Sequence, residues 1–92
     1  DAHAGSTETS VLLHISPDSV RSDDMVVGNR APIATLLSAM REGGVASVSA
    51  NGVLGDPTTA SAADGAALVD GLVTRLGEAI RRWNVAENGL LR

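Results

Sequence analysis

The sequence contains no cysteine, no phenylalanine and no tyrosine, and Trp83 is its only aromatic residue. The absence of cysteine excludes a disulfide framework and any metal site built from thiolates. Aromatic side chains bury the largest areas, so a core of valine, leucine, isoleucine and alanine is thin or is completed by something else. A compact chain of this length buries only about 60% of its extended surface, which is marginal for independent stability.

Arginine is the only long cation, and the net charge is −4. This charge balance argues against a nucleic-acid partner. No apolar run is long enough to span a membrane, and no basic segment followed by an apolar stretch marks a secretory signal. The chain also begins at Asp1 rather than at methionine. We therefore expect part of a larger, cytoplasmic protein that binds neither nucleic acid nor membrane.

The first twenty residues predict one helix. Positions 8, 11, 12 and 15 share a helical face, and the hydroxyls of Ser6 and Thr7 are candidate N-caps for a helix that begins near Glu8. Ser16-Pro17 ends it. Because Glu8 heads an otherwise apolar face, its carboxylate is expected to point toward the packed side of the helix.

The middle of the chain, from residue 18 to about 56, is rich in loop-forming residues. A short helix is expected over residues 34–41, and the weak alternation of residues 45–49 predicts a short edge strand. Gly55-Asp56-Pro57 is a turn signal.

The last third predicts a long helix from Ser61 to about Trp83, with Asp64 as the partner in a capping box. Its apolar stripe consists of Leu68, Leu72, Leu76, Ile80 and Trp83, widened by Val69, Val73 and Ala79. Such a stripe needs a sheet or another helix to cover it, and this chain offers little of either. Trp83 is interpreted as a packing anchor, and the tail after it is expected to fray.

His3 and Glu8 are the first candidates for chemistry. Glu8 lies in a first helical turn, where free backbone N–H groups favour the ionised carboxylate, and His3 lies just upstream. Together they are interpreted either as a metal ligand with a proton-transfer group, or as an ordinary first-turn acid beside a loop histidine.

Two other patterns are weaker. Ser10 and His14 lie one helical turn apart, but no third residue is evident to orient a Ser–His pair, which favours an incidental spacing. The segment from Gly52 to Asp56 either lets backbone approach a ligand at Gly55 and Asp56, or is simply a turn.

Two motifs resemble the creatininase (creatinine amidohydrolase) family. One is His3-Ala4-Gly5-x-x-Glu8-Thr9-Ser10, and the other is Gly52-Val53-Leu54-Gly55-Asp56-Pro57-Thr58 before a long final helix. Together with Gly28-Asn29-Arg30-Ala31-Pro32, the sequences of these motifs are most similar to the mycofactocin-system branch of that family. Its members trim a modified precursor peptide.

The resemblance implies an α/β fold, a three-layer α/β/α sandwich of which this chain is the C-terminal, mostly helical part. Residues 1–83 would belong to the domain and residues 84–92 would form its tail. The family's members are ring-like homo-oligomers, so a hexamer or octamer is expected. Their sites hold two divalent metal ions, here iron(II), zinc or manganese, and most of the ligands would come from an N-terminal remainder of the same enzyme.

The resemblance also implies roles. His3 is the expected catalytic proton-transfer group, and Glu8 is the expected metal ligand, with general base as its alternative role. The implied activity is metal-dependent cleavage of a peptide that releases a cross-linked Val–Tyr-derived dipeptide. The alternatives are hydrolysis of a small cyclic amide or formamide, and a non-catalytic assembly segment. The 92-residue chain alone is expected to be inactive.

Overall fold

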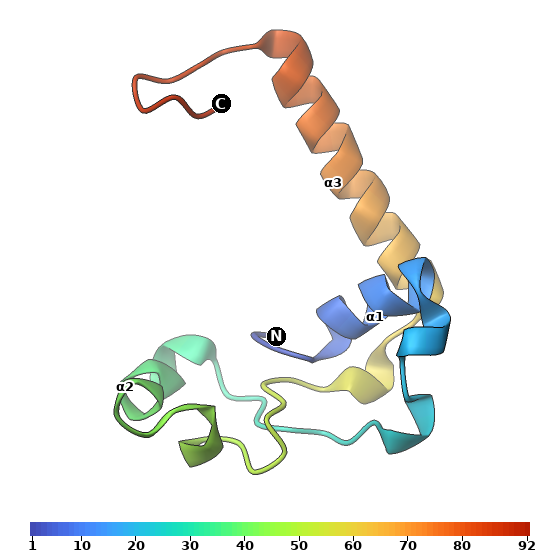
Figure 1. Cartoon of the computed structure of the whole chain (residues 1–92), viewed down its shortest axis with the longest axis vertical. Helices are drawn as coiled ribbons and strands as arrows, with labels where there is room; N and C mark the ends of the chain where they lie inside the picture. Colours follow the sequence, from blue (N-terminus) through green and yellow to red (C-terminus); the bar gives the residue numbers. More distant parts are fainter.

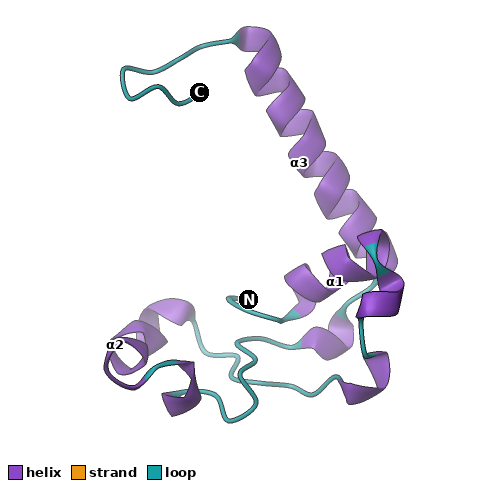
Figure 2. Ribbon diagram, in the orientation of Figure 1, coloured by secondary structure: helices purple, strands orange, loops and turns teal.

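A computed structural model describes all 92 residues as three α helices joined by loops (Figures 1 and 2). The helices are α1 (Ser6–Ile15), α2 (Ile33–Gly43) and α3 (Ala62–Arg82). Short 3-10 helices occupy Pro17–Ser19, Ser22–Asp24, Val45–Ser47 and Pro57–Thr59. The chain contains no β-strand. The sheet of the expected sandwich is therefore not found within these residues.

The edge strand expected over residues 45–49 is wrong. Val45–Ser47 forms a 3-10 helix instead. Gly44 turns the chain with a φ of 73°, and the Ser47 hydroxyl donates to the carbonyl oxygens of Ala39 and Gly44. These bonds tie the segment back to the end of α2, so its backbone is not extended.

Helix α1 begins at Ser6. Its N-cap residue is Gly5, which has no side chain that could accept a hydrogen bond from the first helical turn. The expected caps from Ser6 and Thr7 are therefore wrong. The carboxylate of Asp1 performs part of that task, because its Oδ2 accepts the N–H of Thr7 at 2.9 Å. A carboxylate is well suited to free N–H groups at a helix start.

The side of α1 that packs on α3 is not the predicted apolar side. Ser10 is buried, and a Cβ added to Gly65 of α3 would lie 1.8 Å from the Ser10 carbonyl oxygen. This close approach requires small residues, so the serine face packs. Leu12 and Ile15, on the predicted face, are exposed.

Helix α3 matches its prediction well. The Ser61 hydroxyl accepts the N–H of Asp64 at 3.1 Å, and the helix ends at Arg82. The predicted capping box is only half formed, because the N–H of Ser61 donates to the Ser10 hydroxyl and not to the Asp64 carboxylate. Trp83 adopts a left-handed conformation with a φ of 45° and is 66% exposed, so within this chain it anchors nothing. The tail does not fray but turns back, with Val85 bridged to Leu91.

Three extended segments form the best-organised part of the molecule. Residues 2–3 pair with Leu54, and on the other side of that loop Gly28 and Asn29 donate to the carbonyl oxygens of Gly55 and Val53, both at 3.0 Å. Leu54 is the only buried hydrophobic residue of the chain. Backbone pairing, rather than an apolar core, holds this region together.

The chain as a whole is open. Its radius of gyration is 16.5 Å, against about 12 Å for a compact chain of this length. Its accessible surface is 6474 Å², against about 5,000 Å² for a compact protein of this size. Figure 1 shows the reason, since α3 extends away from the other elements beyond its contact with α1. Leu68, Leu72, Leu76 and Ile80 are accordingly 39–59% exposed.

Candidate functional site

His3 and Glu8 meet at the turn that leads into α1. The Nδ1 atom of His3 lies 3.5 Å from Oε2 of Glu8, and the two side chains are 60% and 57% exposed. The same Oε2 accepts the N–H of Ala4 at 2.7 Å, and Ala4 has a left-handed φ of 52°. The turn therefore brings the carboxylate back over the residue that follows His3 and places the two side chains next to each other.

The prediction that the Glu8 carboxylate is buried is wrong. Its carboxylate was predicted to point toward the packed side of the helix, but α1 packs through Ser10, and Glu8 faces away. The Oε1 atom of Glu8 accepts no hydrogen bond within the chain. One carboxylate oxygen is thus positioned by the backbone and the other is available to a ligand.

The Gly52–Thr58 loop lies directly beside His3. The N–H of Leu54 donates to the His3 carbonyl oxygen at 2.8 Å, and the N–H groups of Ala2 and His3 both donate to the Leu54 carbonyl oxygen. Two motifs separated by half of the chain are therefore neighbours through backbone hydrogen bonds. Sequence spacing alone did not specify this pairing.

Gly55 is required by close packing. Its φ is 155°, and a Cβ there would lie 2.6 Å from the Cβ of Asp1. Gly5 is buried against the same Asp1 side chain. Any larger residue at Gly55 would push residue 1, and with it the strand-like segment that carries His3, away from the loop.

Asp56 is held by its own turn. It accepts hydrogen bonds from the hydroxyl and the backbone N–H of Thr58. The hydroxyl is the main reason that the pKa of Asp56 lies below its ordinary value, and the charge of Arg30 lowers it further, while partial desolvation opposes the shift. Asp56 is therefore an ionised structural cap of the loop.

A hollow of about 350 Å³ lies between the start of α1 and the loop, and neither His3 nor Glu8 lines it. Gly55 and Asp56 line it together with Asn29 and Arg30. Arg30 makes no ion pair or side-chain hydrogen bond within the chain. Sequence reasoning named Arg30 only within the Gly28–Pro32 motif and assigned it no role, because a single arginine in a loop carries no local signal of function.

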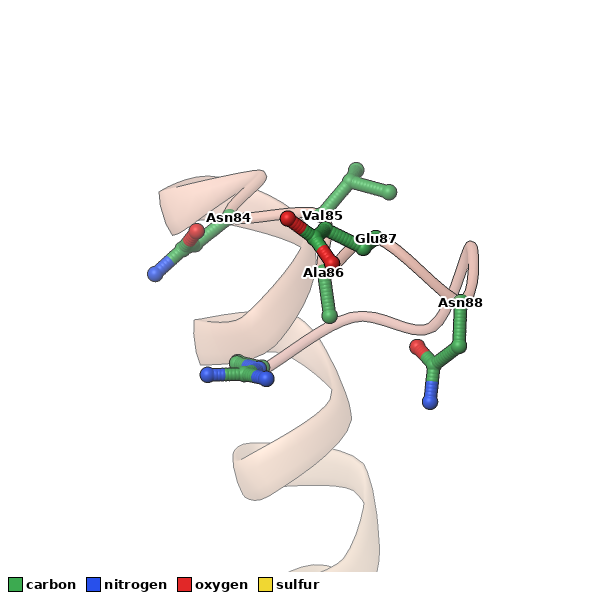
Figure 3. Close-up of a pocket in the computed structure, with 6 residues that line it drawn as sticks. Asn84, Val85, Ala86, Glu87 and Asn88 are labelled. Carbon is green, nitrogen blue, oxygen red and sulfur yellow. The ribbon is translucent and has the colours of Figure 1, made fainter.

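A larger hollow, of about 490 Å³, lies in the C-terminal tail (Figure 3). Asn84, Val85, Ala86, Glu87 and Asn88 surround it, with Arg92. None of the predicted site residues lines it, so its size does not make it part of the candidate site.

The Ser10–His14 spacing forms no pair. The Ser10 hydroxyl is buried and accepts the N–H of Ser61 at 3.1 Å, which joins α1 to the start of α3. His14 is exposed and makes no side-chain hydrogen bond. Ser10 is thus a packing residue.

The donor set for a metal is partial. No three histidine, aspartate or glutamate side chains gather in this chain as a metal ion would require. An imidazole nitrogen and a carboxylate oxygen are nevertheless donors that divalent zinc, iron and manganese accept. His3 and Glu8 fit one edge of such a site and not a whole one.

No helix of the chain combines the length and the hydropathy that a membrane crossing needs. No solved structure matches the chain.

The match to curated proteins is strong. The chain is 58% identical over 91 residues to the mycofactocin precursor peptide peptidase of Mycolicibacterium smegmatis, covering 99% of this chain and 37% of that protein. It is 56% identical over 95 residues to the proteins of the same name from Mycobacterium tuberculosis and Mycobacterium ulcerans, covering 99% of the chain and 36% of each relative.

The chain thus spans little more than a third of the length of these relatives. The sequence model of the creatininase family, described as creatinine amidohydrolase, matches residues 1–80, which include both motifs around His3 and Leu54. The resemblance predicted from those motifs is confirmed, and the chain belongs to the creatininase family.

Proposed function

We propose that this chain is part of a metal-dependent hydrolase that cleaves the mycofactocin precursor peptide and releases its C-terminal, cross-linked Val–Tyr-derived dipeptide. The identity of 56–58% to peptidases named for that substrate supports the substrate class. The observation that carries the chemistry is the His3–Glu8 pair, with its nitrogen and oxygen 3.5 Å apart and both side chains exposed.

Glu8 is the proposed metal ligand of this chain. Its Oε2 is fixed by the N–H of Ala4, which leaves Oε1 oriented and without a hydrogen bond. The other ligands of two divalent ions, iron(II) or zinc or else manganese, come from the part of the enzyme outside this chain. When bound, such ions activate water and polarise the amide carbonyl.

His3 is the proposed proton-transfer group. Its backbone is fixed on both sides of the residue by Leu54 and the Ala4 turn, while its side chain is 60% exposed and its Nδ1 lies 3.5 Å from Oε2 of Glu8. A histidine so placed takes a proton from the attacking water and returns one to the leaving amine nitrogen. Glu8 also helps to orient the imidazole, because the carboxylate lies next to Nδ1.

The loop at Gly55 and Asp56 is the proposed wall of the substrate site. Gly55 keeps the loop against the segment that carries His3, and the Asp56–Thr58 turn makes it rigid. Arg30 adds an unpaired cation to the same wall. A peptide has room to approach from the open side of this hollow.

Assembly is part of the proposal. The exposed apolar stripe of α3 and the coverage of 37% of a relative's length both support an N-terminal remainder that covers the stripe. The family resemblance supports a ring-like homo-oligomer, a hexamer or octamer, in the cytoplasm. Without the remainder the chain would be inactive.

The test is a chimera in which this chain replaces the matching 91 residues of the M. smegmatis relative. The expected result is release of the C-terminal dipeptide from the modified precursor peptide, detected by mass spectrometry and abolished by a chelator. A folded, metal-loaded chimera that hydrolyses only a small lactam or formamide would favour the amidohydrolase alternative. A chimera that folds and binds no metal would favour an assembly segment.

A further inference from the structure

The two family motifs both contact one side chain to which the proposed mechanism gives no role, that of Asp1. Gly5 of the first motif is buried, and a Cβ added there would overlap the Asp1 carboxylate. A Cβ added to Gly55 of the second motif would lie 2.6 Å from the Cβ of Asp1. The Asp1 side chain therefore lies against two glycines, because a larger residue at either position would take its place.

The Asp1 carboxylate reaches the first turn of α1. Its Oδ2 accepts the N–H of Thr7 at 2.9 Å, six residues along the chain. Thr7 is the second residue of the helix, so its N–H has no partner within the helix. Asp1 itself directly precedes the segment that carries His3 and pairs with Leu54. The hydrogen bond, which we call the Asp1 tether, thus joins the His3 segment to the helix that carries Glu8.

Glu8 makes a second link, in the opposite direction. Its Oε2 reaches back from the first turn of α1 and accepts the N–H of Ala4 at 2.7 Å. The two carboxylates therefore close the same turn from its two ends. The Asp1 tether involves no group of the proposed mechanism, whereas Glu8 is the proposed metal ligand. Asp1 can hold the turn without occupying the carboxylate that a metal ion needs.

His3 and Glu8 have separate supports. The backbone of His3 is paired with Leu54, whereas Glu8 belongs to α1, which packs on α3. Only Ala4, with a left-handed φ of 52°, and Gly5 lie between the paired segment and the helix. The Asp1 tether closes a ring that contains this connection and so restricts its torsions. The 3.5 Å separation of the two side chains depends on that restriction.

We propose that Asp1 is a positioning residue, whose carboxylate holds the His3 segment on the first turn of α1 and so keeps His3 and Glu8 next to each other. This inference rests on the function proposed above. A misplacement of about 1 Å costs on the order of 10²-fold in rate when reacting groups must be aligned. Asp1 therefore acts on the reaction through His3 and Glu8.

The first measurement is kinetic and uses the complete enzyme with the modified precursor peptide. Asp1→Ala should lower kcat by about 10–100-fold, the range for partners that orient a functional group. Asp1→Asn should restore kcat and keep the wild-type KM, because its amide oxygen also accepts a hydrogen bond at a helix start. Ser61→Ala is the matched control. It removes the side-chain cap of a different helix, α3, and should leave kcat unchanged.

The second measurement needs no turnover. Hydrogen exchange of the complete enzyme, read by mass spectrometry at single-residue resolution, reports the amides of Thr7 and Ala4. Asp1→Ala should speed exchange at both amides by about tenfold, because each loses a charge-assisted hydrogen bond. Asp1 contacts only the Thr7 amide, so the change at Ala4 reports the position of Glu8. Ser61→Ala should instead speed exchange at Asp64.

Several results would overturn the proposal. Unchanged exchange at Ala4 in Asp1→Ala, or wild-type kcat in that variant, would mean that the tether does not position the pair. A raised KM in Asp1→Asn would make Asp1 a substrate-binding group instead. An equal loss of kcat in Ser61→Ala would mean that the effect follows stability. A wild-type enzyme that cleaves no precursor peptide would overturn the proposed function alone, since exchange at Ala4 still tests the tether.

Discussion

The two ends of this molecule are held together in different ways. Around His3, three extended segments are joined by backbone hydrogen bonds, and all seven buried residues of the chain lie there, in the neighbouring loop or where α1 meets α3. Beyond that contact α3 continues for most of its length with its apolar side uncovered. The first region completes its polar contacts within the chain, whereas the second has apolar surface that only another part of a protein can cover. One end of the molecule is therefore closed by its own hydrogen bonds, and the other presents apolar surface.

The largest expected effect falls on the rigid end. His3→Ala in the complete enzyme should lower turnover by roughly 10²–10⁴, the range for general acid–base groups. Bound metal should stay close to the wild-type amount, because Glu8 and the outside ligands remain. Turnover and metal stoichiometry measured on the same sample decide this, and loss of metal would make His3 a ligand.

The second prediction separates Glu8 from His3. Glu8→Gln keeps the shape and removes the negative charge, so it should lower metal affinity by about 10–100-fold along with turnover. Competition with a chelator of known affinity measures it. Retention of all the metal with loss of turnover would instead assign Glu8 the role of general base.

The third prediction compares the two ends of one helix. Gly65→Ala would place a Cβ 1.8 Å from the Ser10 carbonyl oxygen, so α1 and α3 must separate, and the free energy of unfolding should fall by about 1–3 kcal/mol.

Gly77→Ala, farther along the same helix, is the matched control. The nearest atom to its Cβ would be Nη1 of Arg81 at 3.9 Å, so alanine should stabilise the helix by up to about 1 kcal/mol. Thermal unfolding of both variants of the complete enzyme measures the difference. Equal effects at the two glycines would mean that the α1–α3 contact does not form as described.

The smallest expected effect concerns the loop beside His3. The pKa of Asp56 lies below its ordinary value of 3.8, so its contribution to stability is complete above that value and is lost as the pH falls through the lowered pKa. Thr58→Val removes the hydroxyl that is the main cause of the shift. The difference in Tm between wild type and this variant should therefore shrink as the pH falls below 3.8. In an Asp56→Asn background, adding Thr58→Val should produce no such pH dependence.

The sequence predicted the elements whose signals are local. Ser61 and Asp64 specify the start of α3, because the cap involves residues three apart, and Ser16-Pro17 specifies the end of α1. The His3 and Glu8 spacing left a chemical pair and an incidental one open, and the structure places their side chains 3.5 Å apart. The motifs around these residues were enough to identify the family, which the family model and the relatives confirm.

Only the tertiary structure decided which faces meet. Periodicity favoured the side of α1 with Leu12 and Ile15, but the fit of Ser10 against Gly65 determined the packed side, because close backbone approach depends on both partners. Leu54 became the neighbour of His3 through hydrogen bonds between backbone atoms, which no side-chain pattern encodes. Capping and helix formation depend on nearby residues, so the sequence predicts them. Pairing between distant segments depends on the shape that each segment presents to the other, and the sequence does not predict it.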